Sequence, residues 1–413
     1  MISRRVFLRD GGLALVGLGV VPSFLYRAAM AAGVGKGKIL VTVFLRGGVD
    51  GLNMIVPFGE KTYYSQRPSI AIPPPTRQGT TALDLDGRFG FHPALAELLP
   101  LYQQNQLAVV HAVGSPHSTR SHFDAQDFIE SGIPGDKTVD DGWINRYLQH
   151  HAQPAATPFR GVSMGSTLPR CLQGKAGAVA VGDINRFDLG GGQARGHARS
   201  TYEQLYAQDS NTLLSGTAAE MFAAIDMLKK ANPSQYKSGP GVKYPGGPFG
   251  QKMRQVAQLI KANVGVELAF VDIGGWDTHV NQGNVDGQLS NLLGQLGNGL
   301  AAFHRDLGDR MENVVILTIS EFGRTVRENG NGGTDHGHAN VMMAIGGTVK
   351  GGRVYGSWPG LDRDQLYERR DLEVTTDFRQ VFGEVLARFK GGNNLDLVFP
   401  GFELDHSKAL GIV

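Results

Sequence analysis

Continuous apolar runs alternate with segments of helical spacing over most of this chain of 413 residues. Short, mainly apolar runs rich in β-branched residues are typical of strands buried on both faces. They occupy residues 39–45, 107–113, 266–273, 314–319 and 341–345. Apolar residues three or four positions apart, which predict helices, occupy residues 93–104, 121–129, 250–261, 289–307 and 377–388. The alternation predicts an α/β fold with a doubly wound, mostly parallel sheet and helices on both faces.

The pattern weakens between residues 153 and 250. Apolar runs are short there, helices are predicted only at 202–206 and 218–230, and residues 234–250 are rich in proline and glycine. We expect a single domain over residues 32–413, a length that suits one large α/β domain. The stretch at about 153–250 is predicted to be an insertion or a cap over the sheet.

Residues 1–31 have the three parts of a twin-arginine export signal. Two adjacent arginines lie in SRRVFLR at residues 3–9, an apolar stretch follows at 11–21, and Ala29 and Ala31 predict cleavage after Ala31. The alternative is a membrane anchor, but the apolar stretch has 11 residues, whereas a bilayer-spanning helix needs about 20. We therefore expect the twin-arginine translocase as an export partner, no stable membrane span, and a periplasmic or otherwise exported protein that crosses the membrane already folded.

Charge and cysteine content exclude several classes of protein. The whole chain has a formal net charge of +2, and the predicted leader, with four arginines and one aspartate, carries +3 of it, which leaves −1 for the rest. Without a strong positive field we expect no nucleic-acid partner. Cys171 is the only cysteine, which rules out an intramolecular disulfide and a thiolate-rich metal or iron–sulfur site. We expect its thiol to be inert rather than reactive.

Acidic, histidine and hydroxyl side chains gather in the segments that directly follow the predicted strands. In doubly wound sheets, ligands bind at the carboxyl ends of the strands, so these segments are expected to converge. Carboxylate and imidazole groups form the donor set for Zn²⁺, Mn²⁺ or Fe²⁺, and several carboxylates can hold two ions about 4 Å apart. The candidate metal ligands are Asp50, Asp277, His279, Glu321, Asp335, His336 and His338.

The two histidine-containing motifs differ in specificity. A single Asp-x-His motif such as Asp277 with His279 also occurs in capped turns. Asp335, His336 and His338 place three donors within four residues, beside glycines. Such clustering favours contact with a metal or a substrate over packing in a core.

Four residues are candidates for catalysis. Ser121 precedes a predicted helix, where the first N–H groups and the dipole attract an anion. Its hydroxyl can attack a phosphate or sulfate ester, although the commoner role of such a serine is a plain N-cap. His122 is a candidate base or ligand. Arg120 and Arg324 can hold the charge of a transferred group, and either can equally be a surface arginine.

Six segments are informative as a set: the twin-arginine leader, FLRGGVDGLN at 44–53, RSHFDAQ at 120–126, GWDTH at 275–279, SEFGRT at 320–325 and TDHGHAN at 334–340. Together they resemble the DUF1501 family. The resemblance covers essentially the whole chain after the leader. It implies a fold similar to the alkaline phosphatase and sulfatase superfamily, with one or two divalent ions, Zn or Mn, at the carboxyl edge of the sheet. It further implies hydrolysis of phosphate or sulfate esters, with an anionic small molecule or glycan ester as substrate.

The sequence departs from the superfamily pattern in three respects. Arg46 and Gly47 stand where an aspartate ligand ends the first strand, the Cys-x-Pro-x-Arg signature of sulfatases is absent, and the register brings His122 close to the place of the nucleophile. The alternative function is therefore a non-catalytic periplasmic or surface binding protein on the same fold. A metal-dependent redox or carbohydrate-modifying enzyme is a third hypothesis, but no G-x-G-x-x-G fingerprint follows a strand to support it.

Overall fold

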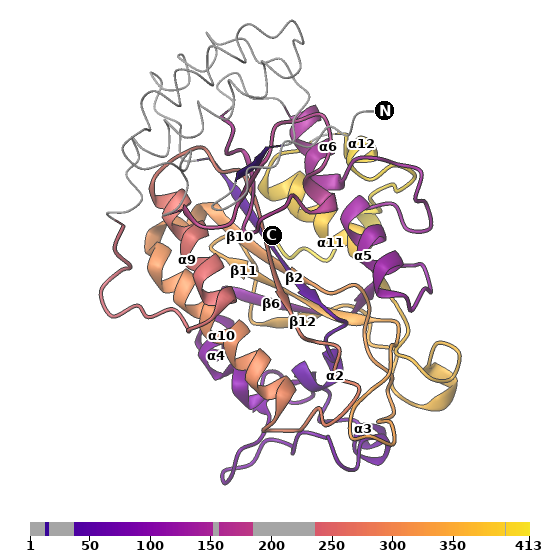
Figure 1. Ribbon diagram of the computed structural model, residues 1–413. Coiled ribbons are helices and arrows are strands. Elements are labelled where there is room, and N and C mark those ends of the chain that lie inside the picture. The colour runs from indigo at the N-terminus through magenta and orange to yellow at the C-terminus, as the bar shows by residue number, and fades with distance from the viewer. Residues whose placement is uncertain (1–12, 16–36, 152–156, 185–235, 393) are drawn as a thin grey trace, which may run out of the picture.

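A mixed β-sheet runs through the middle of the molecule, with helices on both sides (Figure 1). The computed structural model describes residues 13–15, 37–151, 157–184, 236–392 and 394–413. Within these residues the sheet has ten strands, nine of them in the order β1-β8-β7-β9-β2-β10-β11-β6-β12, while β13 pairs with β6 off this path. The predicted fold class, an α/β fold with a mostly parallel sheet covered by helices, is confirmed.

The elements of the sheet and its covering layers have the following bounds. The strands are β1 (Leu13–Leu15), β2 (Ile39–Arg46), β6 (Leu107–Gly114), β7 (Gly161–Ser163), β8 (Val179–Val181), β9 (Leu268–Gly274), β10 (Val314–Ile319), β11 (Asn340–Gly346), β12 (Arg353–Tyr355) and β13 (Thr376–Asp377). The main helices are α5 (His122–Ser131), α6 (Trp143–His150), α9 (Pro248–Lys261), α10 (Gln288–Leu307) and α11 (Phe378–Glu384). A small separate sheet has the order β3 (Ile55–Val56), β5 (Gly90–Phe91) and β4 (Leu83–Asp84).

Strand direction decides which segments share an edge of the sheet. β2 lies between β9 and β10 and is parallel to both. β11 is antiparallel to both of its neighbours, β10 and β6, so β6 again runs in the direction of β2. The carboxyl ends of β2, β6, β9 and β10 therefore meet the amino end of β11 at one edge. The connection from β10 to β11 begins and ends at this same edge.

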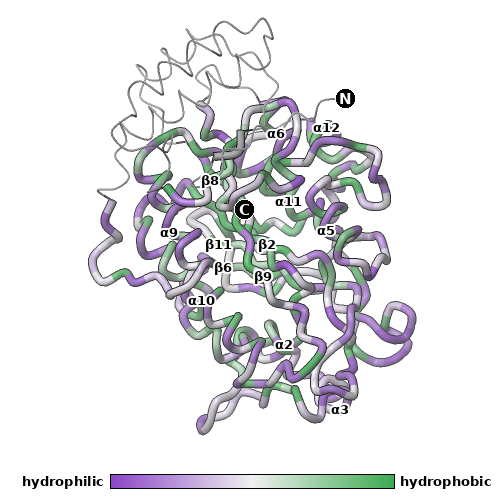
Figure 2. The backbone as a smooth tube through the Cα atoms, viewed as in Figure 1, coloured by the Kyte–Doolittle hydropathy of each residue, from purple (hydrophilic) through white to green (hydrophobic). Residues whose placement is uncertain are grey.

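The side chains of the central strand alternate between two hydrophobic cores, one on each face of the sheet. In β2, Val41, Val43 and Leu45 belong to the core that α9 and α10 cover, whereas Leu40 and Phe44 belong to the core that α6 and α11 cover. All five side chains are buried. Burial on both faces explains why this strand is a continuous apolar run. Figure 2 shows hydrophobic residues concentrated in the middle of the molecule and hydrophilic ones in the outer loops.

Every predicted strand is present, and two predicted helices differ in detail. The segment predicted as one helix at 93–104 is a 3₁₀-helix, η1 (Pro93–Leu98), followed by α4 (Leu99–Gln103), and Leu95 within η1 departs from helical backbone angles. The helix predicted at 377–388 is α11, which continues as a π-helical turn, η8 (Val385–Phe389).

The stretch predicted as an insertion or cap contributes to the main sheet. Two short strands within it, β7 and β8, extend the sheet beyond β9. The helices predicted at 202–206 and 218–230 lie outside the described residues. Of the predicted leader, three residues form β1, which pairs antiparallel with β8. The arginine pair and the predicted cleavage site lie outside the described residues.

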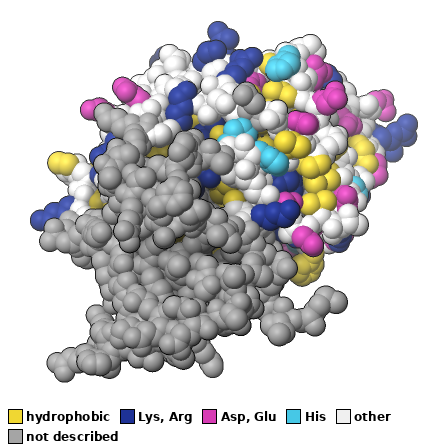
Figure 3. Space-filling model, turned by 90° about the horizontal axis from the view of Figure 1, so that it is seen from above, with side chains coloured by type: hydrophobic (Ala, Val, Ile, Leu, Met, Phe, Trp, Pro, Cys, Tyr) yellow, Lys and Arg dark blue, Asp and Glu magenta, His cyan; other side chains and the backbone are white. Residues whose placement is uncertain are grey.

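The surface carries mixed charges, and the single cysteine lies in the interior. Where the surface in Figure 3 is described, charged side chains of both signs are mixed with histidine and hydrophobic ones. Among the described residues, no helix combines the length with the hydrophobicity needed to cross a lipid bilayer. Cys171 is buried, and burial raises the pKa of its thiol well above the usual value. A thiol in such surroundings is a poor nucleophile.

Candidate metal centre

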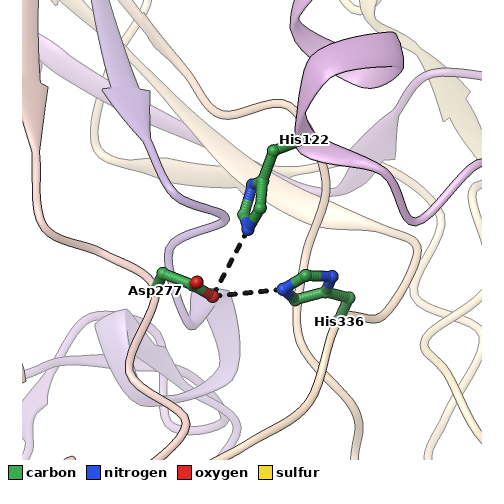
Figure 4. Close-up of side chains that lie close together, drawn as sticks. All are labelled: His122, Asp277 and His336. Carbon is green, nitrogen blue, oxygen red and sulfur yellow. Dashed lines mark hydrogen bonds and ion pairs between the residues drawn. The ribbon is translucent and has the colours of Figure 1, made fainter.

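Histidine and aspartate side chains from separate segments meet at the carboxyl edge of the sheet (Figure 4). Asp277 Oδ1 lies 3.1 Å from His336 Nε2 and 3.4 Å from His122 Nε2. One donor atom from each of the three residues lies within 4.8 Å of the other two. His279 adds a further donor, because its Nε2 is 3.0 Å from Asp277 Oδ1 and 2.9 Å from His336 Nε2. We call these four residues the donor cluster.

The fold explains how the cluster assembles. His122 is the first residue of α5, which follows β6, and Asp277 follows β9. The loop after β2 passes close to Asp277: a Cβ on Gly47 would lie 2.7 Å from the Asp277 nitrogen, and Gly47 has a φ of +119°. Only glycine permits this approach and this backbone conformation without strain. His336 lies in the connection from β10 to β11, which stays at this edge because β11 is antiparallel.

A hydrogen bond at Nδ1 orients each histidine of the donor cluster. The pairs are His122 with Glu321 Oε1 (2.8 Å), His336 with the carbonyl oxygen of Arg120 (2.8 Å) and His279 with Asp335 Oδ1 (3.2 Å). Carboxylate and carbonyl oxygens only accept, so each Nδ1 carries a proton and each Nε2 of the neutral ring offers a lone pair. Metal-binding histidines have this arrangement, with an outer acceptor that sets the tautomer.

The convergence of the Nε2 atoms is unfavourable unless a cation lies between them. The Nε2 atoms of His279 and His336 are 2.9 Å apart and both face the carboxylate of Asp277. His122 Nε2 is buried, and the acceptor beside it is Asp277 Oδ1, at 3.4 Å. A shared proton or a metal ion removes this repulsion. In a tetrahedral zinc site with bonds of about 2.0–2.1 Å, the ligand atoms lie about 3.3 Å apart. The separations of Asp277 from the three histidines and of His279 from His336 are close to this value. The group whose donor atoms all lie within 4.8 Å of one another is His122, Asp277 and His336.

Arg324 anchors Asp277. Its partners are Asp277 Oδ1, at 2.6 Å, the carbonyl oxygens of Gly47, Gly48, Trp276 and Thr334, and His279 Nε2, which lies 3.5 Å from Arg324 Nη1. Burial alone would raise the pKa of Asp277, but the hydrogen bond and charge of Arg324 outweigh it, and with the neighbouring histidines they lower the pKa to about 2. The Arg324 side chain is fully buried and its N–H groups point to protein acceptors. Its predicted role as a clamp on a transferred group is therefore replaced by a structural one.

Glu321 is the buried partner that orients His122. Its Oε1 accepts from the Gly47 N–H at 2.8 Å, from Gln126 Nε2 at 2.9 Å and from His122 Nδ1. Burial opposes ionisation, but these hydrogen bonds lower the pKa of Glu321 below its ordinary value. The hydrogen bond from His122 to Glu321 in turn raises the pKa of that imidazole. Glu321, predicted as a ligand, is thus an outer partner of the cluster.

Two other predicted ligands lie away from the donor cluster. Asp50 is fully buried, pairs with Arg67 Nη1 at 2.7 Å and accepts from Gln282 Nε2 at 2.7 Å. His338 is buried and packs its ring against Tyr367, with centroids 4.4 Å apart. Burial lowers the pKa of His338. Within the described residues, neither side chain contacts the donor atoms of the cluster.

Of the predicted catalytic residues, His122 belongs to the donor cluster, whereas the side chains of Ser121 and Arg120 make other contacts. Ser121 is the N-cap of α5, and its Oγ accepts from the Asp124 N–H at 3.5 Å. The Arg120 side chain pairs with Glu368 at 2.6 Å and with Asp371 at 2.7 Å, so it contributes to the cluster only through its carbonyl oxygen. His122, predicted to act in catalysis, lies among the donor atoms themselves.

Two supporting residues escaped the prediction from sequence. Gln126 lies four residues after His122 on the same face of α5, so helical spacing was a usable signal for it. Arg370 had no such signal. Its Nη2 donates to the His336 carbonyl oxygen at 2.8 Å, and its side chain is 41 % exposed.

The family assignment agrees with the motifs that surround the cluster. The model of the DUF1501 family, described as a protein of unknown function, matches residues 37–394. The chain belongs to the DUF1501 family. The match includes every residue of the donor cluster. No curated protein matches this DUF1501 chain.

Three solved structures are distantly similar to the DUF1501 protein. A variant of the alkaline phosphatase PafA is 11 % identical with a TM-score of 0.33, covering 70 % of this chain and 64 % of that one. The lipoteichoic acid synthase LtaP from Listeria monocytogenes is 10 % identical with a TM-score of 0.29, covering 74 % and 60 %. The PsFucS1 sulfatase from Pseudoalteromonas sp. is 13 % identical with a TM-score of 0.35, covering 89 % and 70 %. The chain spans less than two thirds of the length of the first two.

Proposed function

We propose that this DUF1501 protein is an exported, metal-dependent hydrolase of phosphate or sulfate esters. The proposal is carried by the convergence of three imidazole Nε2 atoms on the Asp277 carboxylate, each ring being held at Nδ1 by an acceptor. Imidazole and carboxylate donors suit Zn²⁺ and Mn²⁺. The twin-arginine leader supports export through a route that carries folded proteins, so the metal would be bound before export.

The residues around the cluster have distinct tasks in this proposal. A bound divalent ion supplies Lewis-acid polarisation of an ester oxygen and a lowered pKa for water. Glu321 keeps the proton of His122 on Nδ1, and Arg324 keeps Asp277 ionised, because its hydrogen bond and charge depress the pKa of that carboxylate. Arg370 donates from Nη2 to the His336 carbonyl oxygen and pairs through Nε with Asp371 Oδ1 at 3.6 Å, while 41 % of its side chain is exposed and offers positive charge to an ester.

Water is the attacking group that the contacts favour. The Oγ of Ser121, the predicted nucleophile, caps α5 and points to the Asp124 N–H. In the hydrolysis, water adds to phosphorus or sulfur, the P–O or S–O ester bond breaks, and the alcohol leaves with a proton.

The second candidate function is binding of a metal and an anionic ligand without hydrolysis. Ser121, Arg120 and Arg324 were predicted to act on substrate, and all three side chains are engaged in hydrogen bonds or ion pairs within the protein. This observation favours a periplasmic or surface protein that binds a metal and an anionic ligand.

Metal content and turnover together test the proposal. The protein is purified without a metal-affinity step, its metal is measured by elemental mass spectrometry, and hydrolysis of an aryl phosphate and an aryl sulfate is followed. We expect His336→Ala and Asp277→Ala to lose both metal and hydrolysis. His406→Ala is the matched control, because His406 is an exposed histidine in a separate 3₁₀ turn, η9 (His406–Lys408).

The outcomes separate the two functions. Bound metal with turnover that is lost in both site variants supports the hydrolase. Bound metal without turnover of either ester supports the binding protein. A folded protein that holds no metal and ignores added ions would refute the metal centre itself.

A further inference from the structure

We propose that Gln282 is a positioning residue that fixes the two ligand-bearing loops of the donor cluster relative to each other. The inference rests on the metal centre proposed above. Gln282 is fully buried. Its Oε1 accepts from Thr278 Oγ1 at 2.8 Å and from Thr334 Oγ1 at 3.0 Å. One amide oxygen therefore joins the loop after β9 to the connection between β10 and β11.

Each threonine is a close neighbour of a ligand. Thr278 lies between Asp277 and His279, and Thr334 lies two residues before His336. Both threonines are buried, and the Thr334 N–H also donates to the Thr278 carbonyl oxygen at 3.2 Å. A shift of either threonine would therefore move donor atoms that stand about 3 Å apart.

The orientation of the Gln282 amide follows from its other partner. Its Nε2 lies 2.7 Å from Asp50 Oδ2. An ionised carboxylate only accepts hydrogen bonds, so the NH₂ group must face Asp50 and the carbonyl oxygen must face the two threonines. The side chain at this position thus needs a donor at one end and an acceptor at the other.

The Asp50–Arg67 ion pair anchors the amide to the rest of the fold. Both side chains are fully buried, and Arg67 also donates from Nε to the Val326 carbonyl oxygen at 2.9 Å and from Nη2 to the Thr325 carbonyl oxygen at 2.8 Å. These carbonyls belong to the connection that carries His336. Asp50, predicted from the sequence as a ligand, therefore acts two hydrogen bonds away from the ligand loops.

A neutral amide is the side chain that meets these requirements. Gln282→Glu would place a second carboxylate against Asp50, which is costly in a buried site. Gln282→Leu would remove a hydrogen-bond partner from Thr278, Thr334 and Asp50 together. Buried polar groups that lack a hydrogen bond destabilise the folded state. Because Gln282→Leu is expected to unfold, the test uses substitutions of Thr278 and Thr334 instead.

The test separates the hydroxyl groups from the shape of the side chains. Thr278→Val and Thr334→Val remove the hydroxyl and keep the shape, whereas Thr278→Ser and Thr334→Ser keep the hydroxyl. Thr157→Val is the matched control, because Thr157 is buried and its Oγ1 donates to the Val264 carbonyl oxygen at 2.7 Å in another part of the fold. The full-length protein is titrated with Zn²⁺ in competition with a chelator, and the visible absorption of the Co²⁺-loaded protein reports the coordination geometry.

We expect each valine variant at 278 or 334 to weaken Zn²⁺ binding by about 10- to 100-fold, the usual effect of losing an outer partner of a metal ligand. Its Co²⁺ spectrum should also change. The serine variants and Thr157→Val should bind and absorb like the unaltered protein. The melting temperature of each metal-free variant is measured as well. The control Thr157→Val should lose as much stability as Thr278→Val and Thr334→Val.

Two results would overturn the inference, and they are distinguishable. If the unaltered protein binds Zn²⁺ and the valine variants bind it equally well, Gln282 does not position the loops, while the metal centre stands. If the unaltered protein binds neither Zn²⁺ nor Co²⁺, the metal centre itself fails, and this inference fails with it.

Discussion

Glu321→Gln tests whether an outer carboxylate sets the metal affinity of the donor cluster. The substitution keeps the shape of the side chain. With the carbonyl oxygen in the place of Oε1, it still accepts from Gly47, Gln126 and His122. The new NH₂ group faces Ser320 Oγ at 3.1 Å, which can accept because its own proton goes to the Leu45 carbonyl oxygen. The variant is therefore expected to fold.

The magnitude follows from the three hydrogen bonds to Oε1. A hydrogen bond to a charged group contributes about 1 kcal/mol more than a neutral one, so three of them amount to about 3 kcal/mol. Part of this loss is offset because a buried amide avoids the cost of burying a charge. We expect the free energy of unfolding to fall by about 1–2 kcal/mol. Metal affinity is expected to fall by about 10- to 100-fold, because a neutral amide keeps the His122 tautomer but no longer supplies the negative charge that makes its Nε2 more basic.

The same variant predicts a change in pH dependence for the metal-free protein. The pKa of Glu321 is depressed in the folded state, so its contribution to stability is complete above the ordinary carboxyl range and is lost as the pH falls through the folded pKa. Glu321→Gln should remove this loss. The pKa of His122 is raised mainly by its hydrogen bond to Glu321, so its contribution to stability is complete below the ordinary histidine range and lost as the pH rises through the folded pKa. In the variant, the His122 pKa should fall.

Urea unfolding, chelator competition and NMR titration of His122 measure these three effects. Glu384→Gln is the control for loss of stability outside the site, since Glu384 is equally buried and accepts from the N–H groups of Leu410 and Ile412 at 2.8 and 2.9 Å. Each of its two oxygens takes one of these hydrogen bonds, so the new NH₂ group faces an N–H donor and the loss of stability should exceed that of Glu321→Gln. Glu384→Gln should lose stability without losing metal affinity. The reasoning is refuted if Glu321→Gln binds metal as tightly as the unaltered protein.

Three further predictions concern single features of the site. Ser121→Ala should lower the free energy of unfolding by about 1 kcal/mol through loss of the α5 N-cap, while turnover continues; loss of turnover at full metal content would instead identify Ser121 as the nucleophile. Arg370→Gln should raise KM for an anionic ester more than it lowers kcat, because an exposed charge contributes mainly to substrate binding, and its exposed neighbour Arg369→Gln is the control that should leave KM unchanged. Removal of the metal with a chelator should lower the melting temperature, because an ion that binds only the folded state stabilises it by an amount that rises with the logarithm of its concentration over Kd, and an unchanged melting temperature would argue against a bound ion.

The strands and their positions along the chain could be predicted, because both depend on local composition. A central strand such as β2 is buried on both faces, so its residues must be apolar without interruption. The direction of β11 could not be predicted in this way. A five-residue apolar run has the same appearance whether its neighbours are parallel or antiparallel, and here the antiparallel pairing is what keeps His336 at the functional edge.

The composition of the donor cluster was partly predictable, but the orientation of its side chains was not. Asp277, His279 and His336 were identified because strand-end loops converge in an α/β fold. Asp50 lies in one of these loops as well, yet its carboxylate turns to Arg67. The partners that decide such orientations come from other segments, as shown by Gln282, which lies 232 residues from Asp50. Residue type and spacing contain no information about contacts of that range.

The central position of β2 has a consequence for the order in which the protein folds. This strand is made early, but its two partners begin only at residues 268 and 314. Contacts between such distant segments form slowly, and an unpaired apolar strand is a template for association with other chains. A chain interrupted before β9 would carry ILVTVFLR with both edges open and should aggregate, whereas a chain that has reached the end of β10 can close the sheet around it.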